Sequence, residues 1–182
     1  MTRQKENHVL RLCRAGILLA LLSILSTLSV FWSTIPFSLS LFGVLLIGCF
    51  LPPVDALLAL CAYLFLGAIG VPVFAGMRGG MDILLGPTGG FLLSYPLVAG
   101  GLSLILERIS GKRKCGFLCV LLATVPMLFL CYLGGGLWYS FLYANGDLVK
   151  GFASAVLPFV PFDLGKAVLA AWLSVRLRRI AL

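Results

Sequence analysis

Charged residues are scarce in this chain. Of its 182 residues only 11% are charged and six are acidic, and there is a single histidine, His8. Soluble globular domains carry about 25% charged residues, and a core of this size cannot hide an apolar fraction of 61% from water. The composition therefore excludes a cytosolic enzyme, a disordered chain and a secreted disulfide scaffold, and it indicates an integral membrane protein.

The sequence contains no recognisable grouping of metal-ligating or catalytic residues. No cysteine belongs to a C-x-x-C pair, and no His, Cys and Ser constellation shares a depth in the apolar runs. Gly111-Lys112 and Gly165-Lys166 lack the other residues of a P-loop. We therefore expect no metal site, no catalytic residue, no cofactor of its own and no ATP hydrolysis. The cysteines are expected to be buried, inert thiols: Cys13, Cys49, Cys61, Cys115, Cys119 and Cys131.

Long uncharged runs divide the chain into predicted membrane spans. A span needs about 20 apolar residues, so the chain has room for roughly six helices and no separate soluble domain. Pro52-Pro53 and Gly70-Val71-Pro72 interrupt the runs, because proline cannot donate a hydrogen bond inside a helix. We predict one all-α membrane domain over 1–182, with six transmembrane helices at about 12–32, 37–52, 55–70, 88–107, 115–134 and 155–176.

The basic residues predict the orientation of the domain. In a six-span arrangement eleven of the 14 Lys and Arg residues lie on one face, and only Arg78 and Lys150 lie on the other. Basic segments stay cytoplasmic, so both termini are expected in the cytoplasm, and the net charge of +8 requires no nucleic-acid partner. The first apolar run is too long for a signal peptide. The eleven residues are Arg3, Lys5, Arg11, Arg14, Arg108, Lys112, Arg113, Lys114, Arg176, Arg178 and Arg179.

Two ionisable residues, Asp163 and Lys166, interrupt the last apolar region. A charge in lipid costs roughly 2.5–3.5 kcal/mol on insertion scales, so such residues more often mark function than packing. Their i, i+3 spacing places them on one helix face, where they partly neutralise each other. Pro161 favours a helix start nearby, with Asp163 at its positive end. The pair is either a structural ion pair or a contact for a polar ligand, and we favour the ligand.

Residues 71–90 contain six glycines and two prolines and are not expected to form a regular helix. Because the segment is partly apolar, we expect an irregular Gly-rich outer loop between helices three and four that caps a binding site, rather than a plain surface loop. Thr88 is predicted to be the N-cap of the fourth helix. An aromatic belt is expected near the outer interface: Phe91, Tyr95, Trp138, Tyr139 and Tyr143.

Several sequence elements occur together in a characteristic order. They are Ile35-Pro36-Phe37-Ser38-Leu39, Gly70-Val71-Pro72-Val73-Phe74-Ala75-Gly76, Gly86-Pro87-Thr88-Gly89-Gly90-Phe91, and the segment from Pro158 to Lys166. In these elements, which extend over nearly the whole chain, the sequence resembles the BioY family, the biotin-binding S components of energy-coupling factor (ECF) transporters.

The resemblance implies a six-helix domain in a prokaryotic plasma or inner membrane, with a pocket near the extracellular side closed by outer loops. It implies that the protein captures biotin outside and topples in the membrane to release the vitamin inside. Energy is expected from partners, namely a transmembrane coupling protein and a pair of cytoplasmic ATPases.

The resemblance also implies which residues bind. Asp163 and Lys166 match the family's Asp-x-x-Lys and are expected to contact biotin. A carboxylate accepts a ureido N–H, and an ammonium donates to a carbonyl or carboxylate. Thr88, Phe91 and Tyr95 are expected to complete the pocket, with Arg78 as a further cation for the carboxylate of biotin. The small residues of the first helix, Gly16 and Ala20, resemble the surface that docks the coupling protein.

The chain departs from the family pattern at a few positions. Ser40 replaces a usual glutamine, and Phe91 replaces a common tyrosine. Phe162 and Gly165 differ from the residues of the usual motif Pro-Gly-Asp-Leu-Leu-Lys around Asp163. A ligand other than biotin, such as a precursor or another vitamin, stays open. The alternative function is a proton-coupled secondary transporter of a small carboxylate or another vitamin, in which Asp163 and Lys166 exchange protons. A small intramembrane enzyme and a purely structural protein fit the sequence less well.

Overall fold

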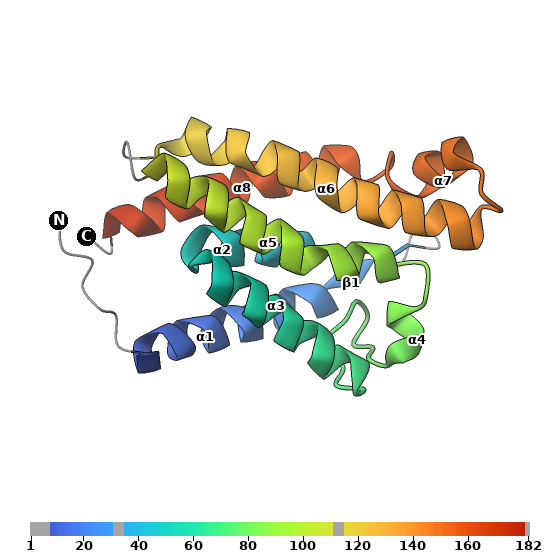
Figure 1. Cartoon of the computed structure of the whole chain (residues 1–182), viewed down its shortest axis with the longest axis horizontal. Helices are drawn as coiled ribbons and strands as arrows, with labels where there is room; N and C mark the ends of the chain where they lie inside the picture. Colours follow the sequence, from blue (N-terminus) through green and yellow to red (C-terminus); the bar gives the residue numbers. More distant parts are fainter. Residues whose placement is uncertain (1–7, 31–34, 111–114, 181–182) are drawn as a thin grey trace.

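The computed structural model describes residues 8–30, 35–110 and 115–180, and within these ranges the chain forms eight helices and one two-stranded sheet. Figure 1 shows that α1, α3 and α6 run toward one end of the molecule, while α2, α5 and α8 run back. The helices are α1 (His8–Thr27), α2 (Ser40–Phe50), α3 (Pro53–Ala68), α4 (Met81–Leu84), α5 (Gly89–Ser110), α6 (Phe117–Tyr143), α7 (Leu148–Ala155) and α8 (Val160–Ile180).

A short antiparallel hairpin connects α1 to α2. Strand β1 (Ser29–Val30) pairs with β2 (Phe37–Ser38), with Ser29 opposite Ser38 and Val30 opposite Phe37. The first helix, expected to reach about residue 32, therefore ends at Thr27, and the second begins at Ser40 rather than near residue 37. The strands take these residues because their backbone groups pair with each other across the hairpin.

Helix α2 forms the centre of the bundle. Nine of its 11 residues are buried, because the sequence is apolar around the whole circumference. A Cβ on Gly43 would lie 2.8 Å from the Leu22 side chain of α1, so glycine is what permits this close approach. The helix ends before Pro52-Pro53, which turn the chain into α3.

Helix α1 is much less buried than α2. Only 11% of the residues in its most apolar stretch are buried, and Leu22 and Ser26 are its buried side chains among those described. At its first turns Arg11 makes a bidentate ion pair with Asp55 of α3, at 2.7 and 2.8 Å. Its apolar outer face is therefore open to lipid or to another protein.

Three helices have the length and apolar character of membrane spans: Val9–Thr27, Gly89–Ile109 and Phe117–Tyr143. The pair Leu148–Ala155 and Val160–Leu177, bent by 52°, makes a fourth if it counts as one span. Helices α2 and α3 are apolar but shorter. The protein is thus a nearly all-helical, multi-pass membrane protein, while its number of spans stays a prediction.

Two predicted helices differ in extent from the observed ones. The helix expected over about 115–134 continues to Tyr143, since Gly134 to Gly136 allow the side chains of α5 and α7 to pack directly against α6. The span expected over about 155–176 is broken: α8 begins at Val160, and α7 lies before it at an angle. Pro158 lies in this break and Pro161 in the first turn of α8, and Asp163 also lies in that first turn, as predicted.

The prediction that all cysteines are buried thiols is wrong. Cys115 and Cys119 form a disulfide at the start of α6, because the i, i+4 spacing brings their Cα atoms to 5.6 Å. Cys13 and Cys61 are free but exposed, and Cys49 and Cys131 are free and buried. All six cysteines lie in or beside apolar runs of the sequence, and those runs do not show whether a cysteine faces the core or the outside of the bundle.

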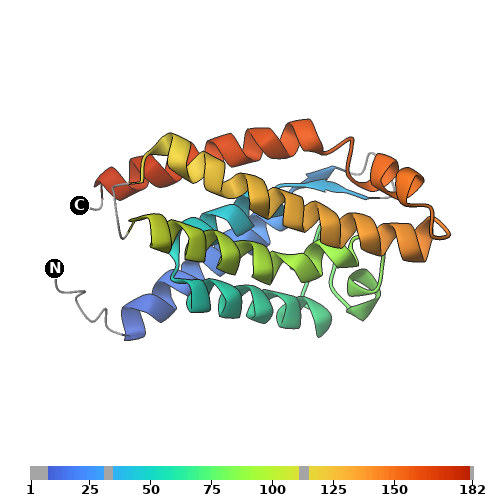
Figure 2. The same cartoon turned by 45° about the horizontal axis from the view of Figure 1, so that its top comes forward.

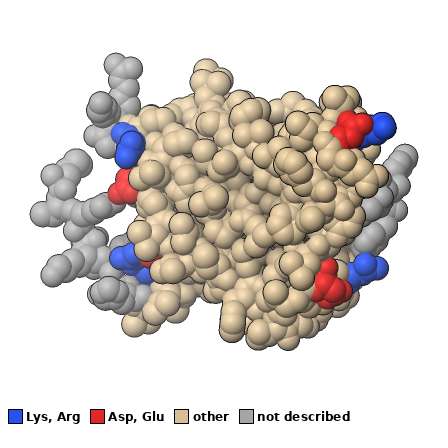
Figure 3. Space-filling model, turned by 45° about the vertical axis from the view of Figure 1, so that its right-hand side comes forward, with Lys and Arg blue, Asp and Glu red and all other residues tan. Residues whose placement is uncertain are grey.

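Charged side chains lie at the two ends of the molecule on the face shown in Figure 3, and the surface between them carries none. The start of α1 and the ends of α5 and α8, which carry Arg11, Arg14, Arg108 and Arg176, lie at the same end in Figure 1. The other predicted cytoplasmic basic residues, or their side chains, lie outside the described part.

The loop between α3 and α5, residues 69–88, is called the outer loop below. It is irregular except for α4, a single turn that the composition did not predict. The Phe74 ring is fully buried against Gly67 of α3, where a Cβ would overlap it. The Gly80 N–H donates to the Gly67 carbonyl at 2.7 Å, and the Phe74 N–H donates to the Arg78 carbonyl at 2.9 Å. Gly67 of α3 therefore contacts the outer loop at both Phe74 and Gly80.

Gly67→Ala is expected to lower the free energy of unfolding by about 1–3 kcal/mol, because the added methyl displaces Phe74 from a filled space. Thermal unfolding in detergent, followed by circular dichroism, measures the change. Gly16→Ala is the matched control, since nothing lies within 4 Å of a Cβ there and alanine favours a helix. Equal unfolding temperatures for the two variants would contradict the role of Gly67.

Candidate ligand-binding site

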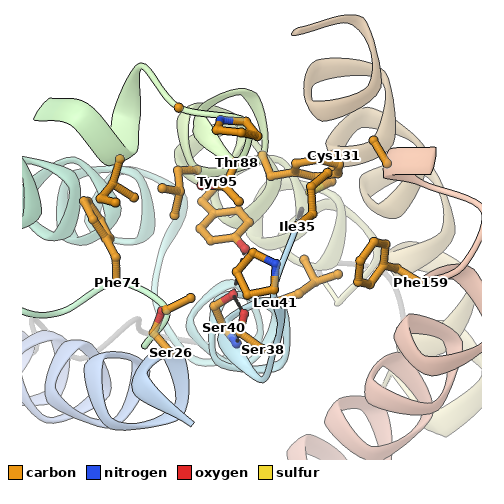
Figure 4. A pocket seen from close by; sticks show the side chains of 18 of the residues that line it. Ser26, Ile35, Ser38, Ser40, Leu41, Phe74, Thr88, Tyr95, Cys131 and Phe159 are labelled. Atoms are coloured by element: carbon orange, nitrogen blue, oxygen red, sulfur yellow. Dashed lines mark hydrogen bonds between the residues drawn. The ribbon is translucent and has the colours of Figure 1, made fainter. Parts of the chain in front are cut away.

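A cavity of about 170 Å³ opens between the outer loop and the helices α2, α5, α6 and α8. Figure 4 shows side chains from these elements pointing into one space, with Ser38, Ser40 and Tyr95 on one side and Phe159 on the other. Figures 1 and 2 place the outer loop and the start of α8 at the end opposite the start of α1. The cavity therefore lies toward one end of the bundle.

The buried ion pair of Asp163 and Lys166 forms part of the cavity wall. The two residues are each 6% exposed, and the Lys166 ammonium donates to Asp163 Oδ1 at 2.8 Å. The Tyr132 hydroxyl of α6 donates to the other carboxylate oxygen, Oδ2, at 3.0 Å. Since a carboxylate has about four acceptor positions, Asp163 keeps capacity to accept hydrogen bonds from a ligand.

Lys166 also fixes the hairpin against α8. Its ammonium donates to the Ser38 carbonyl at 2.7 Å and lies 4.2 Å from the centroid of the Phe37 ring. Phe37 in turn meets Phe162 edge-on, with ring centroids 5.0 Å apart. The ion pair therefore has a structural role in addition to its position on the cavity wall.

A row of hydroxyl groups lines the side of the cavity formed by β2, α2 and α5. The Ser38 and Ser40 hydroxyls are 2.6 Å apart, and the Ser40 hydroxyl is 2.8 Å from that of Tyr95 (Figure 4). Tyr95 is 6% exposed. Ser40 thus bonds to Tyr95 at the cavity wall.

The outer loop forms the remaining wall and is tied to α6. The Trp138 indole donates to the Gly86 carbonyl at 3.0 Å, and the Tyr143 hydroxyl donates to the Leu85 carbonyl at 2.9 Å. Two residues of the predicted aromatic belt therefore hold the loop. Thr88 is in the N-cap position of α5, where its carbonyl accepts the Leu92 N–H at 3.2 Å.

The predicted site residues meet in one place. Asp163, Lys166, Thr88, Tyr95, Phe91 and Arg78 all line the cavity. Gly16 and Ala20 do not; both are exposed on α1.

The sequence prediction missed Ser26, Phe74, Asp82, Cys131 and Tyr132, which also line the cavity. Tyr132 carried no indication in the sequence, because its partner Asp163 is 31 residues away and on another helix.

The cavity suits a ligand with a neutral N–H donor, an apolar body and an anionic end. Asp163 accepts hydrogen bonds, Phe91 and Phe159 supply aromatic walls, and Arg78 is a cation on the outer loop. Among the described residues no group of three or more His, Cys, Asp or Glu is arranged to hold a metal ion.

Comparison with known proteins gives consistent results. The BioY family model matches residues 1–182. A biotin transporter BioY of Thermotoga maritima is 36% identical over 170 residues, 93% of this chain and 96% of that protein. A probable biotin transporter BioY of Pyrococcus horikoshii is 35% identical, covering 90% of this chain and 93% of that protein. A crystal structure of the S-component for biotin from an ECF-type ABC transporter superimposes with a TM-score of 0.87 and 26% identity, covering 98% and 95% of the two chains.

Lys166→Met is expected to destabilise the fold by about 3–5 kcal/mol, because it leaves the Asp163 carboxylate buried without a cation. Combining it with Asp163→Leu is expected to recover most of that loss, since no charge then stays buried. Chemical or thermal unfolding of the ligand-free variants measures both. A double variant as unstable as the single one would mean that the bond from Lys166 to the Ser38 carbonyl, rather than the ion pair, carries the stability.

Proposed function

The chain belongs to the BioY family and serves biotin uptake as a membrane transport component, and we propose that the cavity is the place where it captures the vitamin. The observation that supports this is the meeting of Asp163, Lys166, Thr88, Tyr95, Phe91 and Arg78 around one space, although up to 88 residues separate them in sequence. The protein is not an enzyme, and it acts through binding and a change of position.

The charges of the cavity favour one orientation of biotin. The Asp163 carboxylate repels the carboxylate of biotin but accepts an N–H of the ureido ring. The second ureido N–H then faces the hydroxyls of Ser40 and Tyr95, and the ureido carbonyl accepts from one of these hydroxyls or from the Lys166 ammonium. The valerate chain extends along Phe91, and its carboxylate reaches Arg78 on the outer loop. The ring system therefore enters first and the carboxylate stays near the entrance.

The bundle is proposed to cross the membrane six times, with both termini and the basic residues in the cytoplasm. Helix α2 is shorter than a bilayer core, with 11 residues and a length of about 16 Å. It is surrounded by other helices, so lipid does not meet its ends and its backbone groups stay satisfied. This arrangement puts the outer loop and the cavity on the extracellular side.

Helix α1 is proposed to dock the transmembrane coupling protein, which works with two cytoplasmic ATPases. Gly16 and Ala20 lie one turn apart and are exposed, and nothing lies within 4 Å of a Cβ at Gly16. A neighbouring helix approaches closely at such small residues. The exposed Ile17 and Ile24 supply apolar surface beside them. Docking there is expected to turn the domain within the membrane and to release biotin inside.

Wild-type protein stripped of carried-over vitamin is expected to bind biotin one-to-one and well below micromolar in calorimetric titration. Asp163→Asn is expected to raise the Kd about 10–100-fold, because an N–H bond to a charged acceptor is replaced by a weaker one. Asn keeps one oxygen that accepts from Lys166, and its amide N–H can donate to the Tyr132 hydroxyl, but the Lys166 ammonium loses its counter-charge. The titration therefore uses variant protein whose folded state is confirmed by circular dichroism.

Asp147→Asn is the matched control for this titration. Asp147 caps α7 outside the cavity and accepts the Lys150 N–H at 3.0 Å, which with the Lys150 ammonium lowers the pKa of Asp147. Asparagine caps a helix equally well, so biotin affinity is expected to stay unchanged. Absence of biotin binding by folded, ligand-free wild type would refute the proposed substrate and direct attention to Ser40 and Phe91.

Gly16→Leu with Ala20→Leu is expected to reduce biotin uptake in cells at least tenfold while biotin binding to the purified protein stays normal. The added side chains point away from the fold and obstruct only a partner. Radiolabelled biotin uptake with the coupling protein and ATPases measures transport. Ala153→Leu, an exposed position on α7, is the control. Normal uptake by the Gly16 and Ala20 variant would show that docking uses another face, and uptake driven by a proton gradient without ATPases would favour a secondary transporter.

A further inference from the structure

The Tyr63 hydroxyl is buried away from lipid and is not used by the proposed binding of biotin. Tyr63 of α3 is 0% exposed, and its oxygen is 2.6 Å from Ser26 Oγ of α1 and 2.9 Å from the Val73 carbonyl of the outer loop. A phenol has one proton, and Tyr63 donates it to the carbonyl. The Ser26 hydroxyl must therefore donate to Tyr63. The three residues form a directed chain from α1 through α3 to the outer loop.

The α1 end of this chain belongs to the most weakly buried long helix of the bundle. Polar contacts tie α1 to α3 near both ends of α1: Arg11 with Asp55, and Ser26 with Tyr63. Ser26 is 1% exposed and lies one turn after the buried Leu22. A displacement of this end of α1 therefore changes the Ser26–Tyr63 distance.

The outer-loop end of the chain lies at the base of the turn that covers the cavity. Val73 directly precedes Phe74, and Phe74, Ala75 and Arg78 all line the cavity. The edge of the Tyr63 ring meets the Phe74 ring, with centroids 5.5 Å apart and planes at 76°. The Tyr63 hydroxyl thus holds the backbone of the outer loop at Val73, and the Tyr63 ring packs against the side chain of Phe74.

We propose that Tyr63 is a positioning residue that couples the position of α1 to closure of the cavity by the outer loop. Hydrogen bonds in a chain strengthen one another, so loss of the Ser26 donor weakens the hold of Tyr63 on Val73. A partner that displaces α1 therefore weakens the bond between Tyr63 and Val73, and the outer loop is then held less firmly over the cavity. This rests on the proposed function, in which α1 docks the coupling protein and the cavity holds biotin.

Tyr63→Phe removes the hydroxyl and keeps the ring against Phe74. We expect the exchange of the Phe74 and Gly80 amide protons in ligand-free protein to become about fivefold faster, the effect of losing one net buried hydrogen bond. Hydrogen–deuterium exchange with mass spectrometry measures it in detergent. Ser26→Ala is expected to accelerate the same amides, and the double variant no further than Tyr63→Phe alone. The coupling would be overturned if the acceleration in the double variant equalled the product of those in the two single variants. Unchanged amide exchange in either single variant would also overturn it.

Biotin kinetics separate this role from a merely structural one. Because the bond holds the cover without touching the ligand, Tyr63→Phe is expected to raise both the association and the dissociation rates of biotin about fivefold, with a Kd within twofold of wild type. A lower unfolding temperature with unchanged rates would overturn the proposal. Ser103→Ala is the control, since it removes a buried hydroxyl that donates to the Leu51 carbonyl in the half of α5 away from the outer loop.

The two readouts distinguish failure of this inference from failure of the proposed function. Amide exchange needs no ligand, so it tests the coupling even if wild-type protein does not bind biotin. If biotin binds and the outer-loop amides of Tyr63→Phe exchange as in Ser103→Ala, the coupling through Tyr63 is wrong and the binding function stands.

Discussion

The ion pair of Asp163 and Lys166 joins three parts of the chain that are distant in sequence. Asp163 accepts from Tyr132 of α6, and Lys166 donates to the Ser38 carbonyl of β2. Neither charge is stable in a membrane interior without compensation, so the start of α8, α6 and the hairpin must lie in their observed positions for either to be buried. The cavity is the space that these elements and the outer loop leave between them.

The outer loop depends on side chains from the helices around it. Trp138, Tyr143 and Tyr63 each donate to one of its carbonyls. A glycine-rich segment has few side chains of its own to bury, yet its backbone acceptors need donors once water is excluded. Hydrogen bonds from α3 and α6 therefore hold the outer loop over the cavity.

Local sequence patterns predicted much of this arrangement. Apolar runs and prolines predicted the ends of α2 and α3, and Pro161 with the i, i+3 spacing predicted Asp163 in the first turn of α8. The extension of α6 to Tyr143, the break before Val160 and the Cys115–Cys119 bond were not predicted. The extension of α6 depends on packing between helices, which leaves no local pattern in a sequence where nearly every face of a helix is hydrophobic. The disulfide and the break have local causes, the i, i+4 spacing and the prolines, whose effect the apolar runs around them concealed.

By itself, the sequence determined that the chain is a membrane protein and that its two interior charges share a helix face. These properties follow from composition and from spacing within a few residues, so no knowledge of the fold is needed. Only the tertiary structure decided which groups meet across the bundle. Lys166 bonds a carbonyl 128 residues away and Ser26 bonds Tyr63 over 37 residues, because such contacts depend on how helices cross and how closely they approach.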